Sequence, residues 1–231
     1  MSLLKIDRSS DVRTDELSTI AEVAKTFVSF GSPRVVIFFS AVFAALRLAV
    51  GGFGWFDLVL VVITAVLVGP VEWVIHLGLL HAPEDSKRMT KYDTGGGHRE
   101  HHLDPQNVGW ALLSWQDVSI FVFLLAGWSA VWALPLTWVV GAPLLGSFLT
   151  AQLLAVLGLL HYEWTHLLVH TRYRPKTRYY KRLARNHRLH HYRSEYHWLG
   201  VTSNLGDRVL GTLPKNKSDV PLSETARTLG G

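Results

Sequence analysis

The chain has 231 residues, enough for one sizeable domain or two small ones. Apolar residues make up 48% of the chain and charged residues only 18%. The chain is therefore more hydrophobic than an ordinary soluble domain. The absence of cysteine excludes disulfides, iron–sulfur clusters and thiolate zinc sites, so any metal needs histidine or carboxylate ligands. The net charge of +5 is compatible with nucleic acid, but the cations lie beside apolar segments, which favours a membrane protein with no nucleic-acid partner.

The first 30 residues alternate charged and apolar side chains and contain no apolar core of a signal peptide. We expect residues 1–34 to be a cytoplasmic leader. Within it, residues 13–30 either form an amphipathic helix on the membrane surface or remain a solvated segment.

Four apolar runs follow, and the last three lie within two long gaps in the distribution of Lys and Arg. A helix needs about 20 apolar residues to cross the hydrocarbon core. Buried helices of a soluble protein are the alternative, but four such runs would overfill a globule of this size. The sequence therefore predicts an all-α, integral membrane fold with four transmembrane helices, the second kinked at Gly69-Pro70. The expected spans are 35–50, 58–80, 118–140 and 143–160.

Cations flank the spans on one side only, which predicts the orientation of the chain by the positive-inside rule. The connections GGFGWFD and WVVGAPLL contain no Lys or Arg. We therefore expect both termini and the 82–116 loop to be cytoplasmic, and Arg47, the one cation within a span, to snorkel. The domain prediction is a membrane domain over 35–212 and a mobile tail over 213–231. The flanking cations are Lys25, Arg34, Lys87, Arg88, Lys91, Arg99 and the basic residues from Arg172 to Arg193.

All twelve histidines fall at the inner ends of these spans or in the segments beside them, so the topology brings them to one membrane face. A lone histidine would be read as a hydrogen-bonded interfacial residue, and a pH sensor needs no repeated His-x-x-His-His pattern. Because positions three and four apart share a helix face, the spacings predict stripes of imidazoles suited to iron, zinc or copper. The histidines are at 76, 81, 98, 101, 102, 161, 166, 170, 187, 190, 191 and 197.

Two acidic residues lie close in sequence to these histidines. Glu72 is one turn before His76, and Glu163 is three residues before His166, so we expect both to orient metal ligands. His76 and His81 are about 140° apart on an ideal helix, and they can point the same way only if the helix ends between them.

The pattern resembles the histidine boxes of the fatty acid hydroxylase superfamily, integral-membrane enzymes that include sterol desaturases, carotenoid hydroxylases and fatty acid 2-hydroxylases. EWVIHLGLLH (72–81) and YEWTHLLVH (162–170) are most similar to the fatty acid 2-hydroxylases, although no cytochrome b5 haem motif is visible. The resemblance covers about residues 60–212. It implies a four-helix membrane stalk under a cytoplasmic helical cap that holds two metal ions. The implied ligands are His76, His81, His98, His101, His102, His166, His170, His187, His190 and His191, with His161 and His197 as possible extras.

The resemblance implies O2-dependent hydroxylation of a lipid by two iron ions, with zinc as a structural but redox-silent substitute. Fatty acyl chains are expected ahead of sterols or carotenoids, and desaturation starts with the same hydrogen abstraction. A membrane zinc hydrolase, and a metal transporter or sensor, remain alternatives from other classes.

Two further surface features carry expectations about partners. Trp110 and Trp115 follow the second box and either border the lipid entrance or form an aromatic belt. The basic segment 172–193 either contacts anionic headgroups or docks an external electron donor, a ferredoxin or a cytochrome b5 with its reductase.

Overall fold

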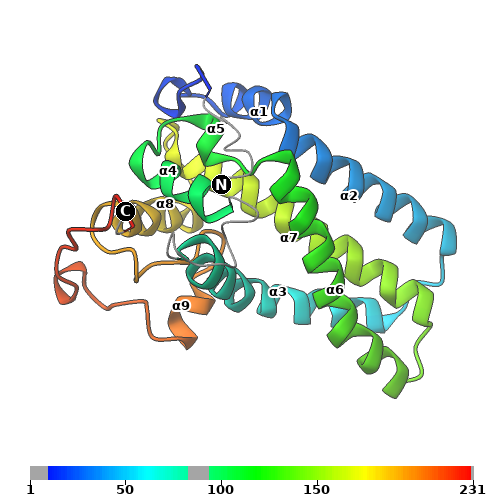
Figure 1. Ribbon diagram of the computed structural model, residues 1–231. Helices are drawn as coiled ribbons and strands as arrows, with labels where there is room; N and C mark the ends of the chain where they lie inside the picture. Colours follow the sequence, from blue (N-terminus) through cyan, green and yellow to red (C-terminus); the bar gives the residue numbers. More distant parts are fainter. Residues whose placement is uncertain (1–9, 83–93, 230–231) are drawn as a thin grey trace, which may run out of the picture.

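The computed structural model describes residues 10–82 and 94–229, and the regular secondary structure of this part is helical (Figure 1). Within these ranges there is no strand, only an isolated bridge between Arg13 and Asn107. The elements in chain order are η1 (Thr14–Glu16), α1 (Ile20–Ser29), α2 (Gly31–Val50), α3 (Trp55–Ile75), η2 (His76–Leu80), α4 (Thr94–Leu103), α5 (Val108–Ala111), α6 (Trp115–Val139), α7 (Leu144–His170), α8 (Arg178–Tyr192), α9 (Leu205–Val209) and η3 (Lys217–Asp219).

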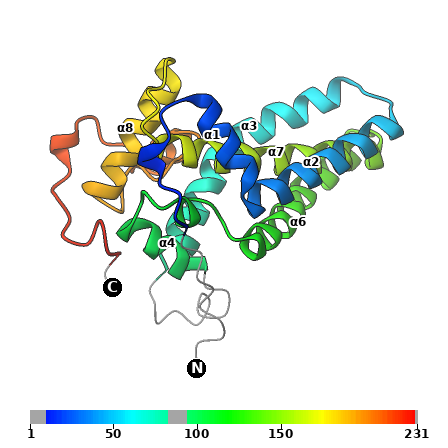
Figure 2. The same cartoon turned by 90° about the horizontal axis from the view of Figure 1, so that it is seen from above.

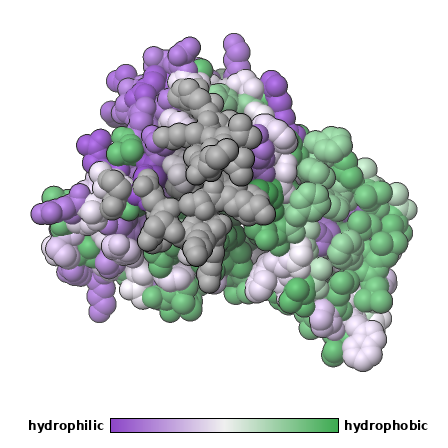
Figure 3. Space-filling view, in the orientation of Figure 1, coloured by the Kyte–Doolittle hydropathy of each residue, from purple (hydrophilic) through white to green (hydrophobic). Residues whose placement is uncertain are grey.

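Helices α2, α3, α6 and α7 are long and apolar enough to cross a membrane. They form a stalk that extends to one side of the molecule, while α1, α4, α5, α8 and α9 form a cap at the other end (Figures 1 and 2). The visible face of the stalk is apolar and that of the cap is largely polar (Figure 3). The predicted all-α membrane fold is therefore confirmed.

Helix α7 is the central element of the stalk and packs against α2, α3 and α6. Its inner face carries small or polar side chains such as Gly146, Ser147 and Ala151, which allow close helix approach. The helix continues ten residues beyond its expected end at Leu160, because no helix-breaking residue occurs before Pro175. The same helix thus spans the stalk and carries His166 and His170 into the cap.

A π-helical turn follows α3 and corrects the expected arrangement of His76 and His81. The helix does not end between them; instead the amide of His81 donates to the carbonyl of His76, five residues earlier, at 3.0 Å. The wider turn reduces the angular separation of the two positions. Their ring centroids are consequently 4.7 Å apart. Lys87, Arg88 and Lys91, three of the flanking cations from which the orientation was predicted, lie outside the described residues.

Arg47 is buried rather than snorkelling, with 2% of its surface exposed. Its guanidinium donates to Asp57 Oδ1 at 2.9 Å and to Thr150 Oγ1 at 2.7 Å. A third hydrogen bond reaches the carbonyl of Gly51 at 2.6 Å. The side chain therefore joins α2, α3 and α7 at the end of the stalk remote from the cap.

Replacing Asp57 with alanine is expected to lower the free energy of unfolding by about 3–5 kcal/mol, because it leaves the buried Arg47 without its counter-ion. The thermal midpoint of the detergent-purified variant measures the effect. The matched control is the double variant Arg47→Met/Asp57→Leu, which removes both charges and should recover most of the loss. Equal destabilisation by the single and double variants would contradict a pairing role.

The N-terminal segment packs onto the cap. Thr19 and Glu22 form a capping box at the start of α1. Leu17, Val23 and Phe27 are buried in one cluster with residues of α7, whereas Ile20 is 45% exposed. The amphipathic face therefore covers protein.

Candidate metal centre

Four elements bring ten histidines together inside the cap. His76 and His81 come from η2 and the residue after it, and α4, α7 and α8 supply the rest. The ten rings form two adjacent groups, within each of which the ligand atoms all lie within 4.8 Å of one another. Group 1 is His76, His81, His98, His102 and His190, and group 2 is His101, His166, His170, His187 and His191.

Ring nitrogens face each other at short distances within both groups. In group 1, Nε2 of His98 lies 3.1 Å from Nε2 of His76 and 3.2 Å from that of His81. In group 2, Nε2 of His187 lies 2.8 Å from that of His170 and 3.1 Å from that of His191. Two nitrogens that each lie about 2.1 Å from one ion at right angles are about 3.0 Å apart, so these spacings fit shared metal ligation.

The remaining inner nitrogens also fit a cation. Nε2 of His102, His166 and His190 is buried and has no hydrogen-bond partner among the described residues. Burial lowers the pKa of His102 to about 3, so the ring is neutral at ordinary pH. Burial is also the main cause that lowers the pKa of His81, His98, His101, His187, His190 and His191. Neutral imidazoles in an all-nitrogen set suit iron, zinc, copper or nickel.

Backbone carbonyls fix the outer nitrogens of several rings. Nδ1 of His76 donates to the carbonyl of Leu199 at 2.6 Å, and that of His190 to the carbonyl of His197 at 3.0 Å. Trp198, between those two carbonyls, has a positive φ of 54°. Its left-handed conformation reverses the chain there, which is unusual for a bulky residue and is held by its burial.

Carboxylates do not take this role at His76, where Glu72 was expected. Glu72 accepts hydrogen bonds from the amides of Val201 and Thr202 and from Thr202 Oγ1 at 2.5 Å. Glu163 accepts from Ser32 Oγ at 2.5 Å and from the amide of Leu113 at 3.1 Å. Both side chains therefore tie α3 and α7 to neighbouring segments.

His161 and His197 are in neither group. Nε2 of His161 lies 3.5 Å from the hydroxyl of Tyr179, and Nδ1 of His197 lies 2.9 Å from Ser194 Oγ. His197 contributes through its backbone carbonyl to His190. In this arrangement, neither side chain adds an extra ligand.

The loop after α8 depends on residues that motif spacing did not single out. Asp207 accepts from the amides of Leu199 and Gly200 at 2.8 Å and from Thr212 Oγ1 at 2.6 Å. At Gly206 a Cβ would meet the carbonyl oxygen of Gly69 at 2.5 Å, so glycine permits the close crossing of α9 and α3. The pattern LGVTSNLGD carried this signal in its two glycines and its acidic residue.

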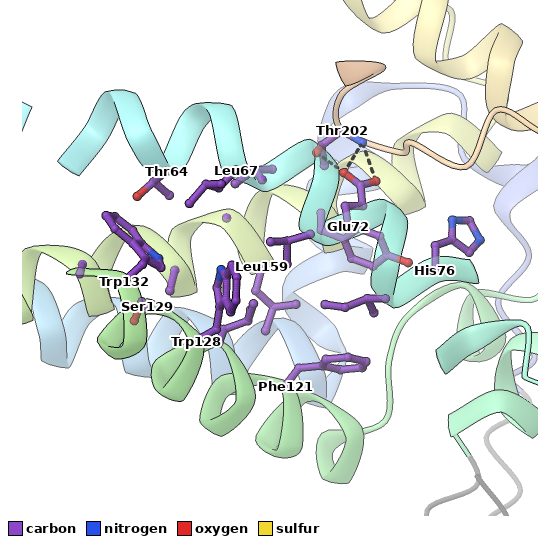
Figure 4. A pocket seen from close by; sticks show the side chains of 18 of the residues that line it. Thr64, Leu67, Glu72, His76, Phe121, Trp128, Ser129, Trp132, Leu159 and Thr202 are labelled. Atoms are coloured by element: carbon purple, nitrogen blue, oxygen red, sulfur yellow. Dashed lines mark hydrogen bonds between the residues drawn. The ribbon is translucent and has the colours of Figure 1, made fainter. Parts of the chain in front are cut away.

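An apolar cavity runs between α3, α6 and α7 and reaches the centre (Figure 4). It encloses about 840 Å³ of empty space, counting its open side. His76 is the member of the ten that lines it, and Thr64 lies at the opposite end in Figure 4. Twelve residues of helix separate the two, which is about 18 Å.

The aromatic lining of this cavity differs from the expected entrance residues. Trp128 and Trp132 of α6 line it. Trp110 instead borders a smaller cavity next to His98. Trp115 is 60% exposed at the start of α6, as an aromatic belt residue would be.

These features define a membrane protein with two buried groups of five histidines and an apolar cavity beneath one of them. The fatty acid hydroxylase family model matches residues 59–212. The chain therefore belongs to the fatty acid hydroxylase family, which is known for iron-dependent hydroxylation.

A solved structure described as full-length scs7p, with only its hydroxylase domain visible, has the same fold. The TM-score is 0.57 at 20% sequence identity, over 90% of this chain and 70% of that one. None of the curated proteins matches the chain.

Proposed function

We propose that this protein hydroxylates a fatty acyl chain with O2 at two iron ions held by the ten histidines of groups 1 and 2. The observation that carries the proposal is the apolar cavity that runs through the stalk and ends at His76. Its walls are almost entirely apolar, which suits a lipophilic ligand. A chain lying between α3, α6 and α7 presents a carbon atom to group 1.

Iron ions bound there would pass electrons from the external donor to O2 and would supply the oxidant for an unactivated C–H bond. The protein positions the acyl chain next to the ions. Cavity residues such as Leu67, Phe121 and Leu159 bind the acyl chain and exclude water from it. Neutral imidazole ligands would not offset the positive charge of the ions. Backbone carbonyls fix the orientation of the rings of His76 and His190.

The cap is proposed to face the cytoplasm, with both termini on that side. The cations at 172–193 lie on the cap, in α8 and the residues beside it, and the two loops at the opposite end of the stalk, 51–54 and 140–143, contain none. Reaction of cysteines introduced at Gly52 and at Lys217 with a membrane-impermeant reagent tests this. Labelling of intact cells at position 52 but not at 217 is the expected result.

Oxygen incorporation tests the proposed reaction. Detergent-purified protein loaded with iron, given a reductant and 18O2, should produce a lipid whose mass increases by one oxygen atom from O2. The zinc-loaded protein should keep the fold and form no product. Hydrolysis without O2 or reductant would replace this proposal with a zinc hydrolase, and loss of two hydrogens would replace hydroxylation with desaturation.

The exposed face of α8 is the proposed docking surface for an acidic electron donor. Helix α8 places His187, His190 and His191 inward and Lys181, Arg182, Arg185 and Arg188 outward. One helix thickness thus separates the cationic surface from the histidines. Charge complementarity accelerates such encounters and makes them sensitive to salt.

Reversing two of these charges, Arg182→Glu/Arg185→Glu, should slow donor-dependent turnover about tenfold at low ionic strength. The difference should shrink as salt is added, and turnover with a small chemical reductant should be unchanged. The matched control is Lys215→Glu/Lys217→Glu, the same charge change at exposed positions away from α8. An equal loss in both variants would contradict docking at α8.

A further inference from the structure

The segment 220–229, here called the strap, lies against the cap although it falls outside the matched family region and was expected to be mobile. Val220 and Ala226 are 4% and 2% exposed. The strap, red in both views, turns back towards α8 in Figure 1 and ends on the side of α4 in Figure 2. Two of its apolar side chains are thus packed against the cap, whereas Leu222 is 69% exposed.

Three cap residues hold the strap along its length. Arg193 Nε donates to the carbonyl of Val220 at 2.7 Å. Glu195 Oε1 accepts from Ser223 Oγ at 3.0 Å and from Thr225 Oγ1 at 2.5 Å. Arg99 of α4 donates to the carbonyls of residues 228 and 229, each at 3.1 Å. Because these anchors flank residue 226 on both sides, they fix the position of its carbonyl.

That carbonyl accepts a hydrogen bond from Nδ1 of His102 at 2.8 Å, between two buried residues. The bond keeps the proton on Nδ1 and leaves the lone pair of Nε2 directed inward. Nε2 of His102 is buried and has no hydrogen-bond partner among the described residues. The strap therefore sets both the tautomer and the orientation of this ring.

The two groups differ in where their outer partners come from. In group 1, His76, His102 and His190 donate to carbonyls of residues 199, 226 and 197, all after α8. In group 2, His166 donates to the carbonyl of Ala111, which precedes α6. Displacing the strap therefore disturbs group 1 and leaves the supports of group 2 in place.

We propose that the strap is a positioning segment for His102 and so controls the affinity of group 1 for its metal ion. The inference deepens the proposed function, since it rests on two ions held by the two groups. Partners that orient a ligating histidine are typically worth about 10- to 100-fold in metal affinity. Because His76 of group 1 also lines the cavity, loss of that ion removes the one next to the acyl chain.

Metal content tests the strap without relying on turnover. The variant Ser223→Ala/Thr225→Val removes both hydroxyl donors to Glu195. After dialysis against chelators of graded strength, we expect one of the two ions to bind about 10- to 100-fold more weakly and the other to be unchanged. Thr225→Ser, which keeps a hydroxyl, should restore the affinity, and Glu224→Ala, an exposed neighbour, should have no effect.

A second variant that ends after Pro221 should bind one ion with unchanged affinity and unfold cooperatively. Equal weakening of both ions, or two ions retained as in the parent chain, would overturn the strap proposal. A parent chain that binds two ions but forms no oxidised lipid would instead overturn the proposed function and leave the strap result standing.

Discussion

Replacing His101 with alanine is expected to remove the group 2 ion and to lower lipid oxidation at least about 1,000-fold, equivalent to about 4 kcal/mol of activation free energy. Nε2 of His101 lies 3.1 Å from that of His170, at the centre of group 2, and the residue is fully buried. The side chain is not part of the cavity lining, so the loss would come from metal binding and not from lipid binding. Metal per chain and oxidised product, measured on the same preparation, check both parts.

The matched control is His161→Ala, on the same membrane side but in neither group. It should retain two ions and change turnover by no more than about threefold. His190→Ala should remove the group 1 ion and leave group 2 occupied. A His101 variant that keeps two ions and full turnover would show that group 2 is not a metal site.

Hydropathy and histidine positions were sufficient to predict the stalk and the gathering of histidines at one of its ends, whereas the choice of ten of the twelve came from the family resemblance. Both are local signals: an apolar run long enough to cross a bilayer, and imidazoles three or four residues apart on a helix. The predicted topology puts the histidine-bearing ends of the spans on one membrane face. Rings far apart in sequence therefore meet there, and the ring centroids of His76 and His190 are 4.6 Å apart.

The outer partners of the rings were not predictable, because they are backbone carbonyls. Every residue has a carbonyl, so nothing in the sequence marks residues 199 or 226 as partners of His76 and His102. Glu72 was assigned to His76 by helical spacing, yet its carboxylate binds two amides 129 and 130 residues away. Long-range loop contacts of this kind depend on tertiary structure that periodicity does not encode.

The same limit applies to Arg47 and to the π-turn. A cation near the end of a span is commonly solvated by snorkelling, and only the fold places Asp57 of the next helix against it. The π-turn at His76–Leu80 inserts an extra residue into the helical repeat. No sequence signal within that turn marks the insertion. At both positions the helix itself was predicted. The burial of the Arg47 side chain and the alignment of His76 with His81 were not.

The second large effect concerns the length of the acyl chain. Thr64 lies at the end of the cavity remote from His76, so Thr64→Phe should fill that end while leaving both histidine groups intact. We expect turnover of the longest accepted chain to fall about 100-fold, about 2.7 kcal/mol, because its distal carbons lose their binding site. Shorter chains should be oxidised at the parental rate, as measured in competition assays with acyl chains of graded length.

Two variants control for bulk and for the hydroxyl. Val66→Phe adds the same kind of ring on α3, but its side chain is 52% exposed on the outside of the protein, so chain-length preference should not change. Thr64→Val keeps the size of the side chain and should retain the parental preference. If Thr64→Phe slowed all chain lengths equally, or left the preference unchanged, the acyl chain would not occupy this cavity, and the substrate would have to reach group 1 by another path.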